Sequence, residues 1–183
     1  MLWPTENCYG RTLSAAISFS RSVPIKMEFS TEFETVENLR RSLPNPNSPN
    51  WIYVIERATE TSASETLNRY PTRGEGREPR PVGLARCNGG TSYVLYVGSK
   101  RRVGLRGRIR QHLSDNASSQ TYALKLGCWY PWKCRVHFRQ YDLPKSAIGS
   151  REDKFYGQVL QIIEDSISEE LEPMFGKRGG NAK

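Results

Sequence analysis

The sequence predicts an α+β domain, in which three short strands and several helices follow one another along the chain. Two runs rich in β-branched and aromatic residues, Trp51–Ile55 and Tyr93–Gly98, are bounded by turn-forming residues and predict strands. A third strand is predicted at Lys133–Tyr141, because apolar and charged residues alternate there, and His137 is expected on its surface side. A short helix over residues 121–126 is expected between the second and third strands, after a serine-rich cap.

The helix predicted over residues 103–113 combines an apolar stripe with a polar one. Leu105, Ile109 and Leu113 recur every four residues and mark the buried side. Arg108 and His112 stand four residues apart on the neighbouring stripe, so their side chains can point at the same spot.

The last predicted helix, residues 150–171, places a carboxylate among apolar residues. The apolar stripe consists of Leu160, Ile163, Ile167 and Leu171. Glu164 lies on that stripe, whereas the other acidic residues nearby point to water: Asp165, Glu169, Glu170 and Glu172. A carboxylate on an apolar stripe must be paired, protonated or bound to a cation to offset its desolvation. Glu164 is therefore a candidate metal ligand.

Positive charge is concentrated in one short run. The chain carries 27 basic and 19 acidic residues, a formal net charge of +8, which favours a polyanionic partner. Six basic residues stand between positions 100 and 110 without an acidic residue among them: Lys100, Arg101, Arg102, Arg106, Arg108 and Arg110. A solvated helix face would intersperse acidic residues, so contact with phosphate groups is the favoured interpretation.

Several classes of protein do not fit the composition. No apolar stretch approaches the roughly 18 residues needed to cross a bilayer, so we expect a soluble protein. The four cysteines show no C-x-x-C spacing, which argues against a zinc site or a disulfide framework and for reduced thiols in a cytoplasm. Residues 1–26 have the composition of a transit peptide, a disordered arm or a mis-assigned start, and these alternatives, organelle targeting included, stay open.

The motifs together resemble the GIY-YIG nuclease superfamily over about residues 50–176. Tyr53 ends the first strand motif, Tyr96-Val97-Gly98-Ser99-Lys100 forms the second, and the next helix reads Leu105-x-x-Arg108-x-x-x-His112. Glu164 precedes Pro173 by nine residues, as the glutamate of the family precedes its proline. The chain departs from the family at three residues and by a two-residue expansion before the helix; the residues are Trp51 in place of Gly, Val97 in place of Ile, and Gly176 in place of Asn.

The resemblance implies a small three-stranded, largely antiparallel sheet flanked by helices. Residues 50–176 would form the nuclease domain, preceded by an N-terminal extension, 1–49, with a short helix over residues 31–41, and followed by a tail, 177–183. The family joins its two motif strands by a short connection, so residues 57–90 would be an insertion. This insertion is either an arginine-rich recognition arm or a passive loop, and we expect the domain to fold without residues 61–87.

The resemblance also implies an active site for phosphodiester hydrolysis with one divalent metal ion, most simply Mg²⁺, with Mn²⁺ as the alternative. Glu164 would bind the metal, Arg108 would stabilise the phosphate charge, and Tyr53 would be the general base, with a pKa lowered by nearby cations. His112 would accept that proton or orient Tyr53, and Tyr96 would fix a phosphate or the water. The expected substrate-binding residues are Ser99, Lys100, Arg101, Arg102, Arg106 and Arg110.

The favoured function is a metal-dependent endonuclease of the restriction type that acts on double-stranded DNA. A repair or junction nuclease and a non-catalytic nucleic-acid-binding module of the same fold are the alternatives, and RNA remains open as a substrate. A nuclease with one active site must form a homodimer or act twice to break both strands.

Overall fold

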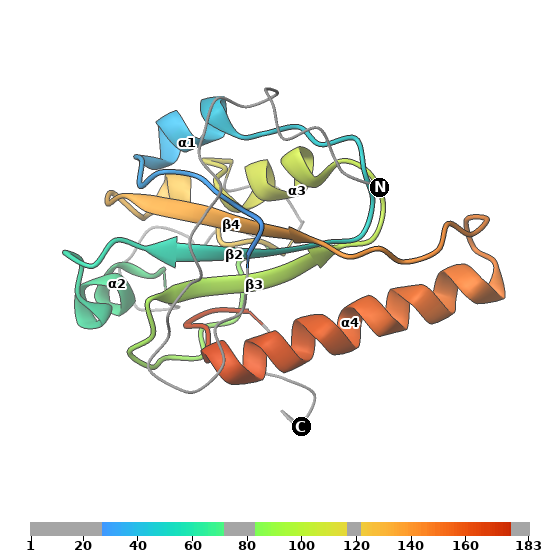
Figure 1. The fold of residues 1–183 in the computed structure, drawn as a ribbon. Coiled ribbons are helices and arrows are strands. Elements are labelled where there is room, and N and C mark those ends of the chain that lie inside the picture. The colour runs from blue at the N-terminus through green and yellow to red at the C-terminus, as the bar shows by residue number, and fades with distance from the viewer. Residues whose placement is uncertain (1–26, 72–82, 117–121, 177–183) are drawn as a thin grey trace.

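A four-stranded antiparallel sheet in the order β1-β4-β2-β3 forms the centre of the structure, a computed structural model that describes residues 27–71, 83–116 and 122–176 (Figure 1). The strands are β1 (Phe29–Ser30), β2 (Trp51–Arg57), β3 (Val94–Lys100) and β4 (Cys134–Gln140). The helices are α1 (Val36–Ser42), α2 (Ala63–Arg69), α3 (Leu105–His112) and α4 (Arg151–Leu171), with a 3-10 turn, η1, at Leu126–Cys128.

The expected α+β class is confirmed, but the expected number of strands is wrong. The additional strand, β1, is two residues long and pairs antiparallel with β4, so that Phe29 stands opposite Phe138. Two residues are too few to show an alternating pattern, which is why the sequence did not reveal it. The N-terminal extension therefore contributes a strand to the same sheet as the strands that follow it.

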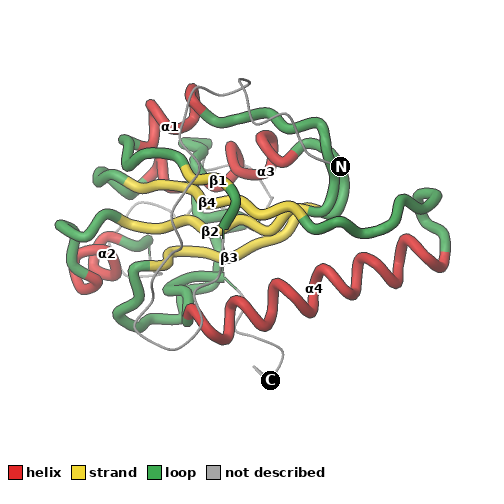
Figure 2. The backbone as a smooth tube through the Cα atoms, viewed as in Figure 1, coloured by secondary structure: helices red, strands yellow, loops and turns green. Residues whose placement is uncertain are grey.

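Alternate residues of the central strand β2 enter two separate cores. Tyr53 and Ile55 pack with Leu105 on the side of α1 and α3. Ile52 and its neighbours on the same face pack with Leu160 on the side of α4. Figure 2 shows α1 and α3 on one side of the sheet and α4 on the other. The sheet is thus covered on both faces, which explains why β2 is buried along its whole length.

Helix predictions differ in outcome along the chain. The helices α3 and α4 form close to the predicted bounds. The first helix begins at Val36 rather than at Thr31, because Thr35 caps it by accepting a hydrogen bond from the Asn38 N–H at 3.3 Å. The prediction of a helix over residues 121–126 is wrong for the described residues of that segment, because Ala123 forms a β-bridge with Leu84. Thr121 lies outside the described residues.

The described parts of the insertion between β2 and β3, residues 57–71 and 83–90, contribute to the core. They contain α2, which begins with a capping box between Ser62 and Glu65 that was not predicted. Tyr70, at the end of α2, stacks on Phe175 with ring centroids 4.5 Å apart, and the returning segment pairs Leu84 with Ala123. Deletion of residues 61–87 would remove Tyr70 and Leu84 and expose their partners, which argues against the expectation that the domain folds without this segment.

His137, expected at the surface from its position in the strand, is buried and 1% exposed. Its Nε2 lies 2.6 Å from Glu56 Oε2, and its Nδ1 lies 2.5 Å from the Ser30 hydroxyl. The Arg135 guanidinium donates to the same Glu56 oxygen at 2.7 Å. These bonds connect β1, β4 and β2 through a buried carboxylate.

Within the described ranges, no helix combines the length and apolarity required to cross a bilayer. Cys87, Cys128 and Cys134 are free thiols, while Cys8 lies outside the described residues.

The cluster around Glu56 should make stability depend on pH. Burial acts to raise the pKa of Glu56, but hydrogen bonds from His137 and Arg135 outweigh it and leave that pKa below its usual value. Burial lowers the pKa of His137. Because the unfolded chain binds more protons at both groups, the free energy of unfolding should decrease as pH falls from about 6.5 towards about 4.

Substitution Glu56→Gln should lower the free energy of unfolding at neutral pH by about 1.5–3 kcal/mol and flatten its decrease in acid. Denaturant unfolding across this pH range measures both effects. Glu37→Gln is the matched control, because Glu37 makes only an exposed ion pair with Arg41 and should change stability by less than about 0.5 kcal/mol. An unchanged pH slope in Glu56→Gln would show that this cluster does not govern acid stability.

Candidate active site

Two tyrosines from neighbouring strands stack on the face of the sheet that carries α3. Tyr53 of β2 stands opposite Gly98 of β3, and the ring centroids of Tyr53 and Tyr96 are 6.2 Å apart with an interplanar angle of 19°. A Cβ at position 98 would lie 2.5 Å from the Tyr53 hydroxyl oxygen and 2.7 Å from the Tyr96 ring. Glycine is therefore required there by the close approach of both rings.

His112 connects α3 to this pair. Its Nε2 lies 3.0 Å from the Tyr53 hydroxyl, and its Nδ1 accepts a hydrogen bond from the Leu124 backbone N–H at 3.2 Å. A backbone N–H can only donate, so Nδ1 carries a lone pair and the neutral ring bears its proton on Nε2. Burial, followed by the charge of Arg108, holds the pKa of His112 well below its usual value. His112 is thus a neutral donor to the Tyr53 oxygen.

Arg108 lies one turn before His112 and acts on both phenols. Burial raises the pKa of Tyr53 and of Tyr96, while the charge and the N–H donors of Arg108 lower both pKa values. For Tyr53 burial is the larger effect, which is the opposite of the lowered pKa that we expected. Arg108 also donates from Nη1 to the Gln111 side chain at 3.0 Å, which holds the guanidinium along α3.

Glu164 approaches the same strand from the other face of the sheet. Side chains alternate along β3, so Ser99, next to Gly98 and opposite Ile52, points towards α4 and donates a hydrogen bond to Glu164 Oε2. Glu164 is 8% exposed between Leu160 and Ile167, as predicted. Its charge raises the pKa of both Tyr53 and Tyr96. The carboxylate is therefore within electrostatic reach of the phenols although it comes from the opposite layer.

The structure brings the five predicted catalytic residues together from four elements. β2 supplies Tyr53, β3 supplies Tyr96, α3 supplies Arg108 and His112, and α4 supplies Glu164. They meet at β3, which is the edge strand of the sheet. Part of its outer edge is covered, because the carbonyl oxygens of Val94 and Leu95 accept hydrogen bonds from the N–H groups of Met174 and Phe175 at 2.9 and 3.0 Å.

The predicted substrate-binding residues do not form one patch. Arg106 and Arg110 donate, each at 3.3 Å, to the carbonyl oxygens of Arg41 and Arg40 in the last turn of α1. Cations are favourable at a helix C-terminus, so these two arginines dock α3 onto α1. Ser99 is engaged with Glu164.

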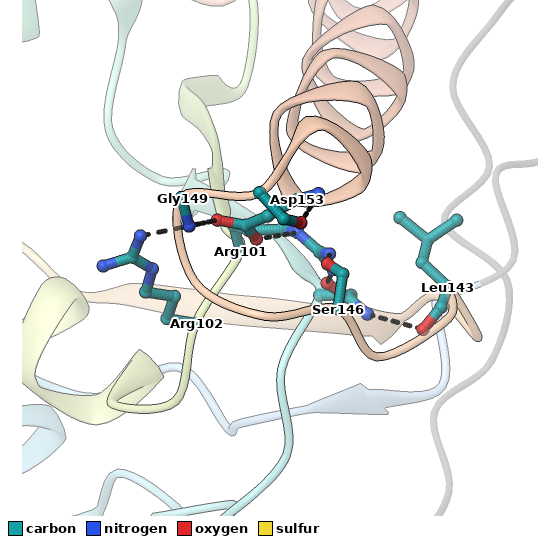
Figure 3. A network of polar contacts seen from close by, with 8 residues as sticks. Arg101, Arg102, Leu143, Ser146, Gly149 and Asp153 are labelled. Carbon is teal, nitrogen blue, oxygen red and sulfur yellow. Dashed lines mark hydrogen bonds and ion pairs between the residues drawn. The ribbon is translucent and has the colours of Figure 1, made fainter.

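The remaining three basic residues lie at the end of β3 and just after it. Arg101 is 19% exposed and takes part in a polar network (Figure 3). Arg102 is 57% exposed and pairs with Asp153 at 3.5 Å. Lys100 is partly exposed at the end of β3. Of these three residues, Arg102 is therefore the most accessible to solvent.

Two further contributors were not predicted. The Leu124 N–H, which selects the tautomer of His112, belongs to a segment expected to be helical. Gly176 has a positive φ of 106°, and a Cβ there would lie 2.8 Å from the Tyr96 ring. Its N–H donates at 2.8 Å to the carbonyl of Arg86, at the end of the insertion. The sequence offers one indication of the close approach of Gly176 to Tyr96, namely a glycine at the position where the family has asparagine.

Comparison of the chain with protein-family models, with curated proteins and with solved structures returns no match. The geometry of these residues is therefore the basis for any functional conclusion.

Substitution Gly98→Ala should destabilise the protein and separate the tyrosine rings. The added methyl would overlap the Tyr53 hydroxyl, and overpacking of this kind costs about 1–3 kcal/mol. Thermal unfolding measures the loss, and near-ultraviolet circular dichroism reports the tyrosine environment. Gly107→Ala is the matched control: it lies within α3, where an added methyl would meet no other atom, so it should stabilise by about 0.5–1 kcal/mol. Equal effects from the two substitutions would contradict the close approach at Gly98.

Proposed function

We propose that the protein is a metal-dependent endonuclease that hydrolyses phosphodiester bonds in double-stranded DNA, as GIY-YIG nucleases do. The observation that carries this proposal is the meeting of Tyr53, Tyr96, Arg108 and His112 with the buried carboxylate of Glu164 at one edge strand. Each residue matches a position of the family motif, and they come from four separate elements. Residues that served packing alone would not need a half-buried arginine beside two tyrosines and a buried carboxylate.

The donor set fits a hard divalent cation, Mg²⁺ or Mn²⁺. The described residues contain no group of three or more histidines, cysteines, aspartates or glutamates that could enclose a metal ion. Magnesium typically binds through one or two carboxylates and completes its shell with water and substrate oxygens. Glu164 would hold the ion, and Ser99 would orient the carboxylate by its hydrogen bond. When bound, the ion would supply positive charge against the charge that develops on the phosphate.

Tyr53 is the proposed general base that takes the proton of the attacking water. Its oxygen receives the Nε2 proton of His112 and lies within reach of Arg108, and donors of this kind favour phenolate over phenol. Burial opposes these donors and raises the pKa of Tyr53, so the phenol stays protonated in the absence of further positive charge such as that of a bound divalent ion. His112 orients Tyr53 rather than taking its proton, because both ring nitrogens are already engaged. Arg108 stabilises the developing phosphate charge.

The restriction-type role is the favoured form of this activity, and it rests on the elaborated connection between β2 and β3. We place the enzyme in the cytoplasm. With one active site per chain, it would break both strands either as a homodimer or in two successive cuts. Supercoiled plasmid incubated with and without Mg²⁺ distinguishes the proposal from a non-catalytic module, and a comparison of branched with linear duplex distinguishes it from a junction nuclease. A non-catalytic module binds without cutting, and a junction nuclease prefers branched over linear duplex.

Substitution Glu164→Gln should abolish cleavage and leave DNA affinity within a few fold. The change removes the proposed metal ligand but little positive surface. Plasmid cleavage and gel-shift titration of the same preparation measure the two properties. Glu169→Gln is the control on the same helix, because Glu169 is exposed and should cut as the wild type does. Cleavage by Glu164→Gln together with its loss in Glu169→Gln would place the metal elsewhere on α4.

The raised pKa of Tyr53 predicts the pH dependence of cleavage. A base works in its deprotonated form, and a raised pKa means that this form becomes more abundant across the whole neutral to alkaline range. The logarithm of the rate should therefore rise with pH, with a slope of about one and no plateau near neutrality. Tyr53→Phe keeps the ring and should change the free energy of unfolding by about 1 kcal/mol or less. Its cleavage rate should fall steeply, and the remaining rate should no longer rise with pH. If Tyr53→Phe retains the wild-type pH profile, Tyr53 is not the base.

A further inference from the structure

Arg101 connects four segments at one end of the sheet. Its guanidinium donates to the Asn50 side chain and, at 3.1 Å, to the Ser146 hydroxyl (Figure 3). Its Nε lies 3.5 Å from Asp153 Oδ1, an ion pair without hydrogen-bond geometry, and its guanidinium carbon lies 5.5 Å from the centre of the Tyr156 ring. One side chain at the end of β3 thus contacts the start of β2, the loop before α4 and the first turns of α4.

The backbone around Arg101 reinforces this connection. Asn50 has a positive φ of 63°, and its N–H donates at 3.1 Å to the Arg101 carbonyl. The Asn50 side-chain amide donates to the Leu143 carbonyl at 3.3 Å, while the Asn50 carbonyl accepts from the Tyr141 N–H at 2.8 Å. The ends of β2, β3 and β4 therefore converge on Asn50 and Arg101.

Asp153 carries the connection into α4. Its backbone N–H is capped by the Ser150 hydroxyl at 3.0 Å, and its Oδ2 accepts from the Gly149 N–H at 3.0 Å. Arg102 pairs with the same carboxylate. Asp153 precedes Glu164 by eleven residues, three turns of helix or about 16 Å.

The first half of α4 has few other means of attachment. Its buried residues begin at Leu160, and Phe155 is 57% exposed. Figure 1 shows this half of the helix extending beyond the sheet. A helix attached to the sheet only through its second half could pivot, and a pivot would move Glu164 relative to Ser99. The contacts of Arg101 remove that freedom at the far end of the helix.

We propose that Arg101 is a positioning residue, which fixes α4 against β3 and so sets the place of Glu164 beside Ser99, rather than a contact for DNA. The consequence for catalysis rests on the proposed function, whereas the effect on α4 does not. Arginine suits the task because its planar fork satisfies two acceptors at fixed angles while its charge meets Asp153.

The test compares Arg101→Ala with Arg151→Ala, which removes an exposed arginine at the start of the same helix. Hydrogen exchange of the α4 amides around Glu164 is followed in each purified variant, and cleavage is measured at several Mg²⁺ and DNA concentrations. Arg101→Ala should exchange faster around Glu164, need more Mg²⁺ for half-maximal rate and lose about 10- to 100-fold in kcat. The KM of Arg101→Ala for DNA and the salt dependence of its DNA binding should equal those of Arg151→Ala. Arg101→Lys, which keeps the charge near Asp153, should recover part of the rate.

Two results would overturn the proposal. If Arg101→Ala reduces the salt slope of DNA binding by about one unit and leaves kcat and exchange unchanged, Arg101 is a phosphate contact. If exchange rises while kcat and the Mg²⁺ requirement stay unchanged, the connection is structural only. A wild-type chain that does not cut would remove the proposed function, and exchange around Glu164 would still decide whether Arg101 fixes α4. Ser146→Ala removes one contact of the network and serves if Arg101→Ala does not fold.

Discussion

The pairing of β2 with β3 in a single register is the constraint on which the rest of the site depends. Tyr53 must stand opposite a residue without a side chain, because its phenol and the Tyr96 ring occupy the space above position 98. A slip by one residue would move Tyr53 to the face covered by α4 and bring Ile52 to the face of α3. Both cores specify the same register, since each receives alternate residues of β2. The fold and the candidate chemistry are thus determined by one set of contacts.

The site joins two layers of the protein at an edge strand. Phenols, imidazole and guanidinium lie on one face of the sheet, and the carboxylate lies on the other. β3 connects them because Gly98 and Ser99 are adjacent and point to opposite faces. The candidate site is therefore divided between the two layers of the protein. Because Glu164 belongs to α4, its position relative to Ser99 depends on how α4 is attached to the sheet. Contacts far from Glu164, such as those of Arg101, can therefore affect the candidate site.

Positive charge in this chain has several uses, and a concentration of arginines does not by itself define a binding surface. Arg106 and Arg110 satisfy carbonyl oxygens at the end of α1, and Arg101 satisfies acceptors from three segments. Each of these interactions connects a helix or a loop to a neighbouring element. The last carbonyl groups of a helix have no partner within the helix, and arginine can reach them while keeping part of its guanidinium in water.

Local patterns in the sequence determined the elements that carry their own periodicity: β2, β3, β4, α3 and α4. The same periodicity placed Glu164 on the buried stripe and set Arg108 and His112 on one face of α3, because side-chain direction along a regular element follows from its repeat. The two-residue strand β1, the extended segment at Ala123 and the core contacts of Tyr70 have no such repeat, and only long-range pairing reveals them. The burial of His137, the tautomer of His112 and the raised pKa of Tyr53 were likewise decided by tertiary structure, since each depends on partners that are distant in the chain.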